Sequence, residues 1–88
     1  GNTALHLACQ NKNENIVKCL IEKGANVNTQ DEVGNTPLLI VCEENNENLA
    51  KYLVKHGANV NAQNKKRNTP LHYACENNNE NIVKDLVE

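Results

Sequence analysis

Cysteine and histidine residues stand three positions apart at two places in this chain, His6 with Cys9 and His72 with Cys75. A thiolate beside an imidazole can attack carbonyl groups, and two such side chains on one helix could hold a metal ion. No acidic residue to orient the imidazole, no oxyanion-hole motif and no glycine-rich phosphate loop accompanies either pair. Zinc usually takes four ligands, and each pair supplies two. The sequence therefore predicts no enzyme, no metal site and no cofactor.

The size and charge of the chain restrict its function further. A chain of 88 residues buries only about 60 to 65 % of its unfolded surface, which leaves little room for an enclosed catalytic cavity. The formal net charge is −2, and the one basic run, residues 65–67, has no aromatic neighbours for stacking bases. The longest apolar run, residues 37–42, is far below the roughly 18 residues of a membrane span. We therefore expect a soluble protein that binds no nucleic acid, membrane or small-molecule substrate.

Any functional side chain of this chain must be held by short helices or strands, and the internal repeats of the sequence indicate which elements these are. With Gly1, Gly34 and Arg67 in one column, three segments align without a gap: GNTALHLACQNKNENIVKCLIE, GNTPLLIVCEENNENLAKYLVK and RNTPLHYACENNNENIVKDLVE. The first and third segments agree at 15 of 22 positions, and the pentapeptide GANVN recurs at residues 24–28 and 57–61. The chain is therefore one domain, residues 1–88, with repeats 1–33, 34–66 and 67–88, the last incomplete.

The sequence of each repeat predicts two short helices. Thr3, Thr36 and Thr69 suit a helix N-cap, and proline follows the second and third of them at the position where its missing N–H costs nothing. A second apolar helix follows each Asn-rich cluster, and the glycine of GANVN ends it. Helices this short are not stable alone, because nucleation is costly. Their stability must come from stacking each helix pair on the next, as in a solenoid.

A 33-residue period containing T-P-L-H-x-A resembles the ankyrin repeat, and the likeness covers the whole chain. The resemblance implies an all-α, ankyrin-repeat α-solenoid with three stacked helix-turn-helix layers and projecting β-hairpin fingers at residues 26–34 and 59–67. Because the outer repeats keep the apolar positions of the middle one, and the chain stops before a third GANVN, we expect a fragment of a longer array.

The resemblance also implies a function, namely binding of a protein partner through a concave face of fingers and inner helices. The alternative is an architectural segment of a longer array whose partner contacts lie elsewhere. Carried across position by position, the expected contact residues are Asn2, Gln10, Asn11, Glu32, Val33, Asn35, Glu43, Glu44, Lys65, Lys66, Asn68, Tyr73, Glu76 and Asn77. Acidic helices beside a basic second finger predict a polar partner with complementary patches. Tyr73 is the best anchor candidate, because aromatic residues are enriched among hot spots.

The cysteines favour a reducing compartment. Cys9, Cys42 and Cys75 recur at the repeat period, but equivalent positions in stacked helices lie about 8–10 Å apart, whereas disulfide Cα atoms come within about 7 Å. We expect these three to be free, small, buried hydrophobes. Cys19 should lie exposed on an outer helix, which suits an intracellular protein, in the cytoplasm. A monomer is expected.

Three further expectations concern individual positions in the repeats. The middle repeat has Leu39-Ile40-Val41 where its neighbours have His-Leu-Ala and His-Tyr-Ala. Either these side chains pack differently in the core, or they form an apolar binding spot centred on Ile40. Asn64 and Arg67 replace the Asp and Gly that are usual in the finger, so the second finger could differ in shape. Asn28 and Asn61 resemble sites that asparaginyl hydroxylases modify in this family.

Overall fold

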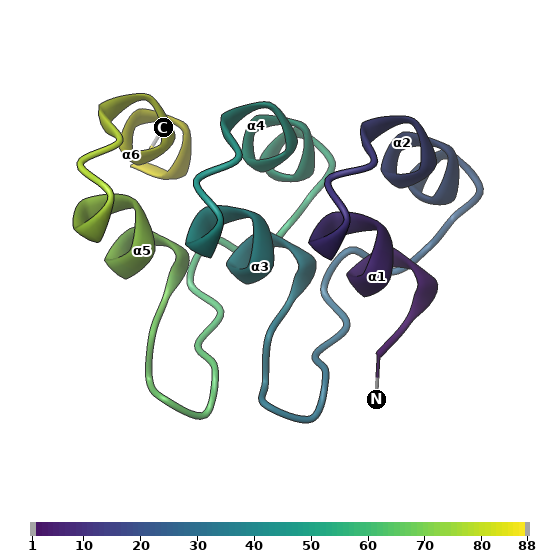
Figure 1. The fold of residues 1–88 in the computed structure, drawn as a ribbon, viewed down its shortest axis with the longest axis horizontal. Helices are drawn as coiled ribbons and strands as arrows, with labels where there is room; N and C mark the ends of the chain where they lie inside the picture. Colours follow the sequence, from purple (N-terminus) through teal and green to yellow (C-terminus); the bar gives the residue numbers. More distant parts are fainter. Residues whose placement is uncertain (1, 88) are drawn as a thin grey trace.

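A computed structural model describes residues 2–87 of the chain. Its helices pair into three layers that stand side by side, with loops projecting from one edge (Figure 1). The helices are α1 (Ala4–Gln10), α2 (Glu14–Glu22), α3 (Pro37–Glu43), α4 (Glu47–Lys55), α5 (Pro70–Glu76) and α6 (Glu80–Val87). Among residues 2–87, none of the helices combines the length and the hydrophobicity that a membrane span requires. The expected all-α solenoid is confirmed, with α1, α3 and α5 as the inner helices.

The inner helices begin where threonine caps them. The Thr36 Oγ1 atom accepts a hydrogen bond of 3.2 Å from the Leu39 N–H, which satisfies one of the free donors at the start of α3. In α1 the cap is reciprocal, because His6 Nδ1 also accepts from the Thr3 N–H at 3.2 Å. Asparagine plays the same role for the outer helices: Asn13 caps α2 at 3.2 Å from the Ile16 N–H.

Left-handed residues connect the two helices of each layer. Lys12, Asn45 and Asn78 have φ angles of 59°, 61° and 54°. Asparagine tolerates this conformation well, whereas the lysine adopts it at some steric cost. The local turn is therefore the same in all three layers despite the different residue in the first.

The fingers differ in detail from β-hairpins, since the described residues contain no strand. Each finger is closed by a tight turn: the Asp31 N–H donates to the Asn35 carbonyl at 2.9 Å, and the Asn64 N–H to the Asn68 carbonyl at 3.1 Å. So short a pairing does not extend into a ladder. The Lys65 N–H also donates to the carbonyl of Val33 at 2.9 Å, so the two fingers lie against each other.

Glycine is required in only one of the two fingers. Gly34 has a φ of 84°, and a Cβ atom there would meet the Asn64 backbone at 3.0 Å. Arg67 occupies the equivalent position with a φ of 66°, where the described chain has no third finger against it. The second finger therefore keeps the hydrogen bonds and the positive φ of the first finger's turn without its glycine, although Asn64 and Arg67 had put its shape in question.

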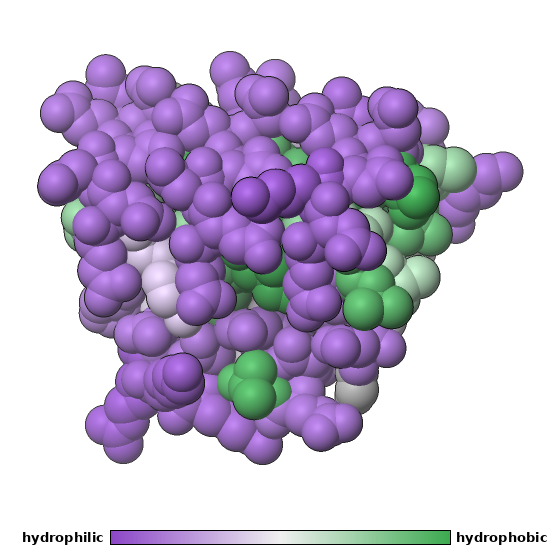
Figure 2. Space-filling view, viewed as in Figure 1, coloured by the Kyte–Doolittle hydropathy of each residue, from purple (hydrophilic) through white to green (hydrophobic). Residues whose placement is uncertain are grey.

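The hydrophobic core runs through all three layers and is most complete in the middle one, where every residue from 37 to 42 is buried. The outer layers each keep one open side, because a layer packs only against its neighbours. Figure 2 shows hydrophilic residues over most of the visible surface, while hydrophobic residues gather at the right edge, over the first layer.

The Asn-rich clusters bind one layer to the next. Asn79 Nδ2 donates to Asn45 Oδ1 at 2.7 Å, and Asn77 Nδ2 donates to the Cys42 carbonyl at 3.2 Å. Asn28 similarly donates to the Gly57 carbonyl and accepts from the next repeat. The asparagine bias thus supports ordered connections, because these amides satisfy polar groups between layers.

Candidate partner-binding face

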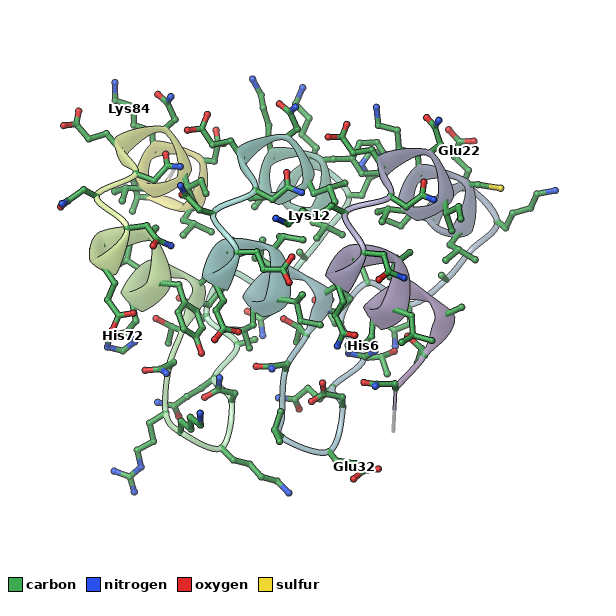
Figure 3. The ribbon with its side chains drawn as sticks, viewed as in Figure 1. His6, Lys12, Glu22, Glu32, His72 and Lys84 are labelled. Atoms are coloured by element: carbon green, nitrogen blue, oxygen red, sulfur yellow. The ribbon has the colours of Figure 1, made fainter. Side chains whose placement is uncertain are left out.

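Most of the contact residues expected from the sequence lie exposed on the fingers or at the carboxyl ends of the inner helices. Figure 3 shows Glu32 at the tip of the first finger with its side chain directed away from the helices. The exposed members of the set are Asn2, Gln10, Asn11, Glu32, Val33, Glu43, Glu44, Lys65, Lys66, Glu76 and Asn77. We call these eleven residues the finger face.

Three of the expected contact residues serve the fold instead. Tyr73 is only 8 % exposed, and its hydroxyl accepts hydrogen bonds from Asn64 Nδ2 at 3.1 Å and Asn68 Nδ2 at 3.2 Å. Asn35 and Asn68 are half-buried, and Asn35 Oδ1 accepts from Asn64 at 3.0 Å. Because Tyr73 holds the second finger against α5, it has little surface to offer, and we do not propose it as an anchor.

Asn64 is the residue that sequence reasoning undervalued. Its Oδ1 atom accepts from the N–H groups of Lys66 at 2.9 Å and Asn68 at 3.1 Å. Asp31 Oδ1 closes the first finger in the same way, at 3.0 Å and 2.9 Å from the corresponding groups. The amide of Asn64 adds two donors that a carboxylate lacks. Its alignment with Asp31 was the signal that could have identified this role.

The middle layer offers no apolar spot at its centre. Ile40 is only 4 % exposed, and Leu39 is fully buried in the place of the histidine. The binding spot centred on Ile40 is therefore not present, because Leu39, Ile40 and Val41 pack into the interior of the middle layer. The equivalent residue of the first layer, Leu7, is exposed because no finger precedes it in the described chain.

The histidine and cysteine of the first layer are both engaged in the fold. His6 Nδ1 contacts Thr3, and its Nε2 lies 2.8 Å from the Asn35 carbonyl of the next layer. Burial raises the pKa of the Cys9 thiol to about 12, and the Glu44 charge adds to the rise. A protonated thiol is a poor nucleophile, so this pair is not poised for chemistry. The described residues contain no group of three or more His, Cys, Asp or Glu side chains that could hold a metal ion.

A family model described as ankyrin repeats, in three copies, matches residues 5–88. The chain belongs to the ankyrin repeat family. Ankyrin repeats are generally protein–protein interaction modules, and the family is typically non-enzymatic. No curated protein matches the chain.

All four cysteines of the ankyrin array are free, but their burial differs by layer. Cys9 and Cys42 are fully buried, and burial raises the pKa of Cys42 to about 12 as well. Cys75 is exposed, so the expectation that it is buried was wrong: the described chain has no layer beyond α5 and α6 to cover it. Cys19 is exposed on α2 as expected.

We expect a thiol reagent such as iodoacetamide to modify Cys19 and Cys75 in the native protein and to leave Cys9 and Cys42 intact. The buried thiols are inaccessible, and their raised pKa values leave almost no thiolate at neutral pH. Peptide mass spectrometry after timed labelling would measure the four rates. Labelling in urea is the control, because all four should then react alike; equal native rates would contradict the burial described.

Proposed function

We propose that this ankyrin array binds a protein partner through its finger face. Family membership supports protein binding in general, and the exposure of eleven of the fourteen expected contact residues supports this face in particular. An intracellular, cytoplasmic location belongs to the same proposal, because four free thiols suit a reducing compartment.

One observation carries the proposal, the position of the carboxylates on the inner helices. Glu43 ends α3, Glu44 caps it, and Glu76 ends α5. A helix carries partial negative charge at its carboxyl end, so an acidic residue there is repelled and lowers the stability of the fold by about 0.3–1 kcal/mol. All three side chains are exposed, and a carboxylate at these positions does not stabilise the fold. A basic surface on a partner would neutralise both the side chains and the helix ends.

The second finger provides the opposite charge. Lys65, Lys66 and Arg67 are exposed at its tip, while Glu32 stands at the tip of the first finger. The hydrogen bond from the Lys65 N–H to the Val33 carbonyl holds the two tips side by side. A partner with a basic patch toward the helices and an acidic patch toward the second finger would fit this arrangement.

Replacing Glu43, Glu44 and Glu76 by glutamine should have opposite effects on binding and on folding. We expect at least a tenfold increase in the dissociation constant, since neutral amides lose the attraction for a basic patch. We also expect the free energy of unfolding to rise by about 0.3–1 kcal/mol per site, because the conflict with the dipole is removed. Partners would be captured from lysate on the immobilised chain and titrated against purified variants.

A matched control uses the three glutamates at the other helix ends. Glu14, Glu47 and Glu80 lie in the first turns of α2, α4 and α6, where a carboxylate favours the helix. Their replacement by glutamine should lower stability and leave binding unchanged. If the inner-helix variant binds every partner as tightly as the original protein, the finger face is not the binding surface and the architectural alternative is favoured.

A further inference from the structure

We propose that the outer helices carry a second interaction surface, which binds an acidic segment of a polypeptide. Five side chains form this surface: Lys18 on α2, and Lys51, Tyr52, Lys55 and His56 on α4 and its carboxyl-terminal cap. We call these five residues the outer cluster. Figure 1 shows α2 and α4 at the edge of the array that lies farthest from the fingers, so the outer cluster is separate from the finger face.

The aromatic ring of Tyr52 organises the outer cluster across two layers. The Lys18 ammonium lies over this ring, 5.6 Å from its centre, which is within the range of a cation–π interaction. The His56 ring stacks on Tyr52 with ring centres 4.1 Å apart, and His56 Nδ1–H donates to the Tyr52 carbonyl at 2.9 Å. Because these contacts restrain the basic side chains beforehand, an anion that binds them costs less side-chain entropy.

An open groove between α2 and α4 lies beside these side chains. Its volume is about 320 Å³, and its lining residues are Glu14, Lys18, Asn48, Lys51, Tyr52 and Lys55. Three lysines and one glutamate give this lining a net charge of +2. The three lysines are exposed, so their charges are available to a ligand in the groove. The groove therefore favours negatively charged side chains.

The helix pairs of the repeat do not require this aromatic and basic character. Tyr52 aligns with Cys19 and Asp85, and Lys55 aligns with Glu22. Lys55 suits the carboxyl end of its helix, but α2 ends with Glu22 and has the same length of nine residues. Since α2 and α4 belong to adjacent layers that the structure describes, the groove does not depend on where the chain begins or ends.

Carboxylates beside the outer cluster favour an acidic polypeptide over a nucleic acid as the occupant. Figure 3 shows Glu22 directed away from the inner helices, and it follows Lys18 by four residues on α2. Glu47 begins α4, and Asp85 lies on α6 at the position that aligns with Tyr52. A nucleic acid binds along an extended positive groove and would meet these carboxylates. A polypeptide can place acidic side chains opposite the lysines and neutral ones opposite the carboxylates.

Fluorescence anisotropy with fluorescein-labelled octaglutamate tests the proposal. The parent protein for all titrations carries Lys65→Gln, Lys66→Gln and Arg67→Gly, so that the basic tip of the second finger does not bind the peptide. We expect saturable binding at about 50 mM salt that weakens as the salt concentration rises, because ions screen exposed charges. Replacing Tyr52 by Cys and Lys55 by Glu, the residues that the first layer carries there, should raise the dissociation constant at least about tenfold.

Lys18→Gln and Lys84→Gln form a matched pair of single variants. Each lysine follows a glutamate by four residues on an outer helix, so both changes remove the same kind of helix-stabilising pair. Only Lys18 is part of the outer cluster. We expect Lys18→Gln to raise the dissociation constant about two- to fivefold and Lys84→Gln to leave it unchanged. Circular dichroism checks that the variants fold, and Tyr52→Asp, the residue of the third layer, replaces Tyr52→Cys if the latter does not.

Several results would overturn the proposal: no binding of octaglutamate by the parent, the same dissociation constant after the Tyr52 and Lys55 replacements, or equal effects of the two single variants. Tighter binding of labelled octathymidylate would assign the outer cluster to single-stranded nucleic acid instead. In two-dimensional NMR spectra, octaglutamate should shift signals of α2 and α4, and larger shifts on the fingers would also contradict the proposal. None of these results bears on the glutamates of the finger face, so the two proposals stand or fall separately.

Discussion

Replacement of Leu38 by alanine is expected to lower the free energy of unfolding by about 2–5 kcal/mol. Leu38 is completely buried in α3, the middle inner helix, which packs against α1, α4 and α5. Truncation removes its buried surface and leaves a cavity that the flanking layers can fill only in part. A domain of this length has a total stability of about 4–13 kcal/mol, so the loss is a large share of it. Urea unfolding followed by circular dichroism would measure it.

Leu71→Ala is the matched control for this prediction. Leu71 occupies the same helical position, after the same threonine cap and proline, but it is 37 % exposed. The change in helix propensity is identical in the two variants. The difference between their losses of unfolding free energy therefore measures how much packing against the following layer contributes. We expect Leu71→Ala to cost less than about half as much as Leu38→Ala. Equal costs would mean that the layers do not stack as described.

His6→Ala is expected to cost about 2–4 kcal/mol, because it removes a buried ring together with its hydrogen bonds on both nitrogens. The backbone N–H of Thr3 can only donate, so Nδ1 is the acceptor and the hydrogen of the neutral ring lies on Nε2. Nε2–H then donates to the Asn35 carbonyl at 2.8 Å and joins the first layer to the second. Thermal and urea unfolding of the variant would measure the loss.

Two further variants separate the contribution of the buried ring from that of its hydrogen bonds. His6→Leu restores a buried side chain like the Leu39 of the middle layer, and we expect it to cost about 1 kcal/mol. The Asn35 carbonyl still accepts from the Asp31 N–H, so no buried acceptor is left unsatisfied. His72→Ala removes only the contacts with Thr69, since His72 is exposed, and should cost about 1 kcal/mol or less. A cost for His72→Ala as large as that for His6→Ala would contradict the interlayer bond.

Features that depend on a few consecutive residues were predicted correctly. The threonine caps, the proline in the first turn and the left-handed turns at Asn45 and Asn78 all occur where the repeat places them. Lys12 and Arg67 also adopt the left-handed conformation, although neither side chain favours it. The surrounding turn, held by the same backbone hydrogen bonds in every copy, outweighs the preference of the single residue.

The candidate site was predicted less completely. The exposed charges of the finger face follow from aligned positions, but the burial of Tyr73 does not. Its hydroxyl is enclosed by Asn64 and Asn68, which are close to it only because the finger folds back on α5. An aromatic residue at a contact position suggests an anchor from sequence alone, and only the hydrogen-bond partners show that it serves the fold.

The sequence by itself determined the repeat period, the helix pairs and the need for stacking, because caps, turns and apolar spacing act within one repeat. The tertiary structure alone decided which copy of an identical residue is covered. Cys9 and Cys75, His6 and His72 occupy the same local conformation, yet only the first of each pair is buried. Burial depends on the neighbouring layer, and repeats of nearly identical sequence differ in whether another layer of the described chain packs against them.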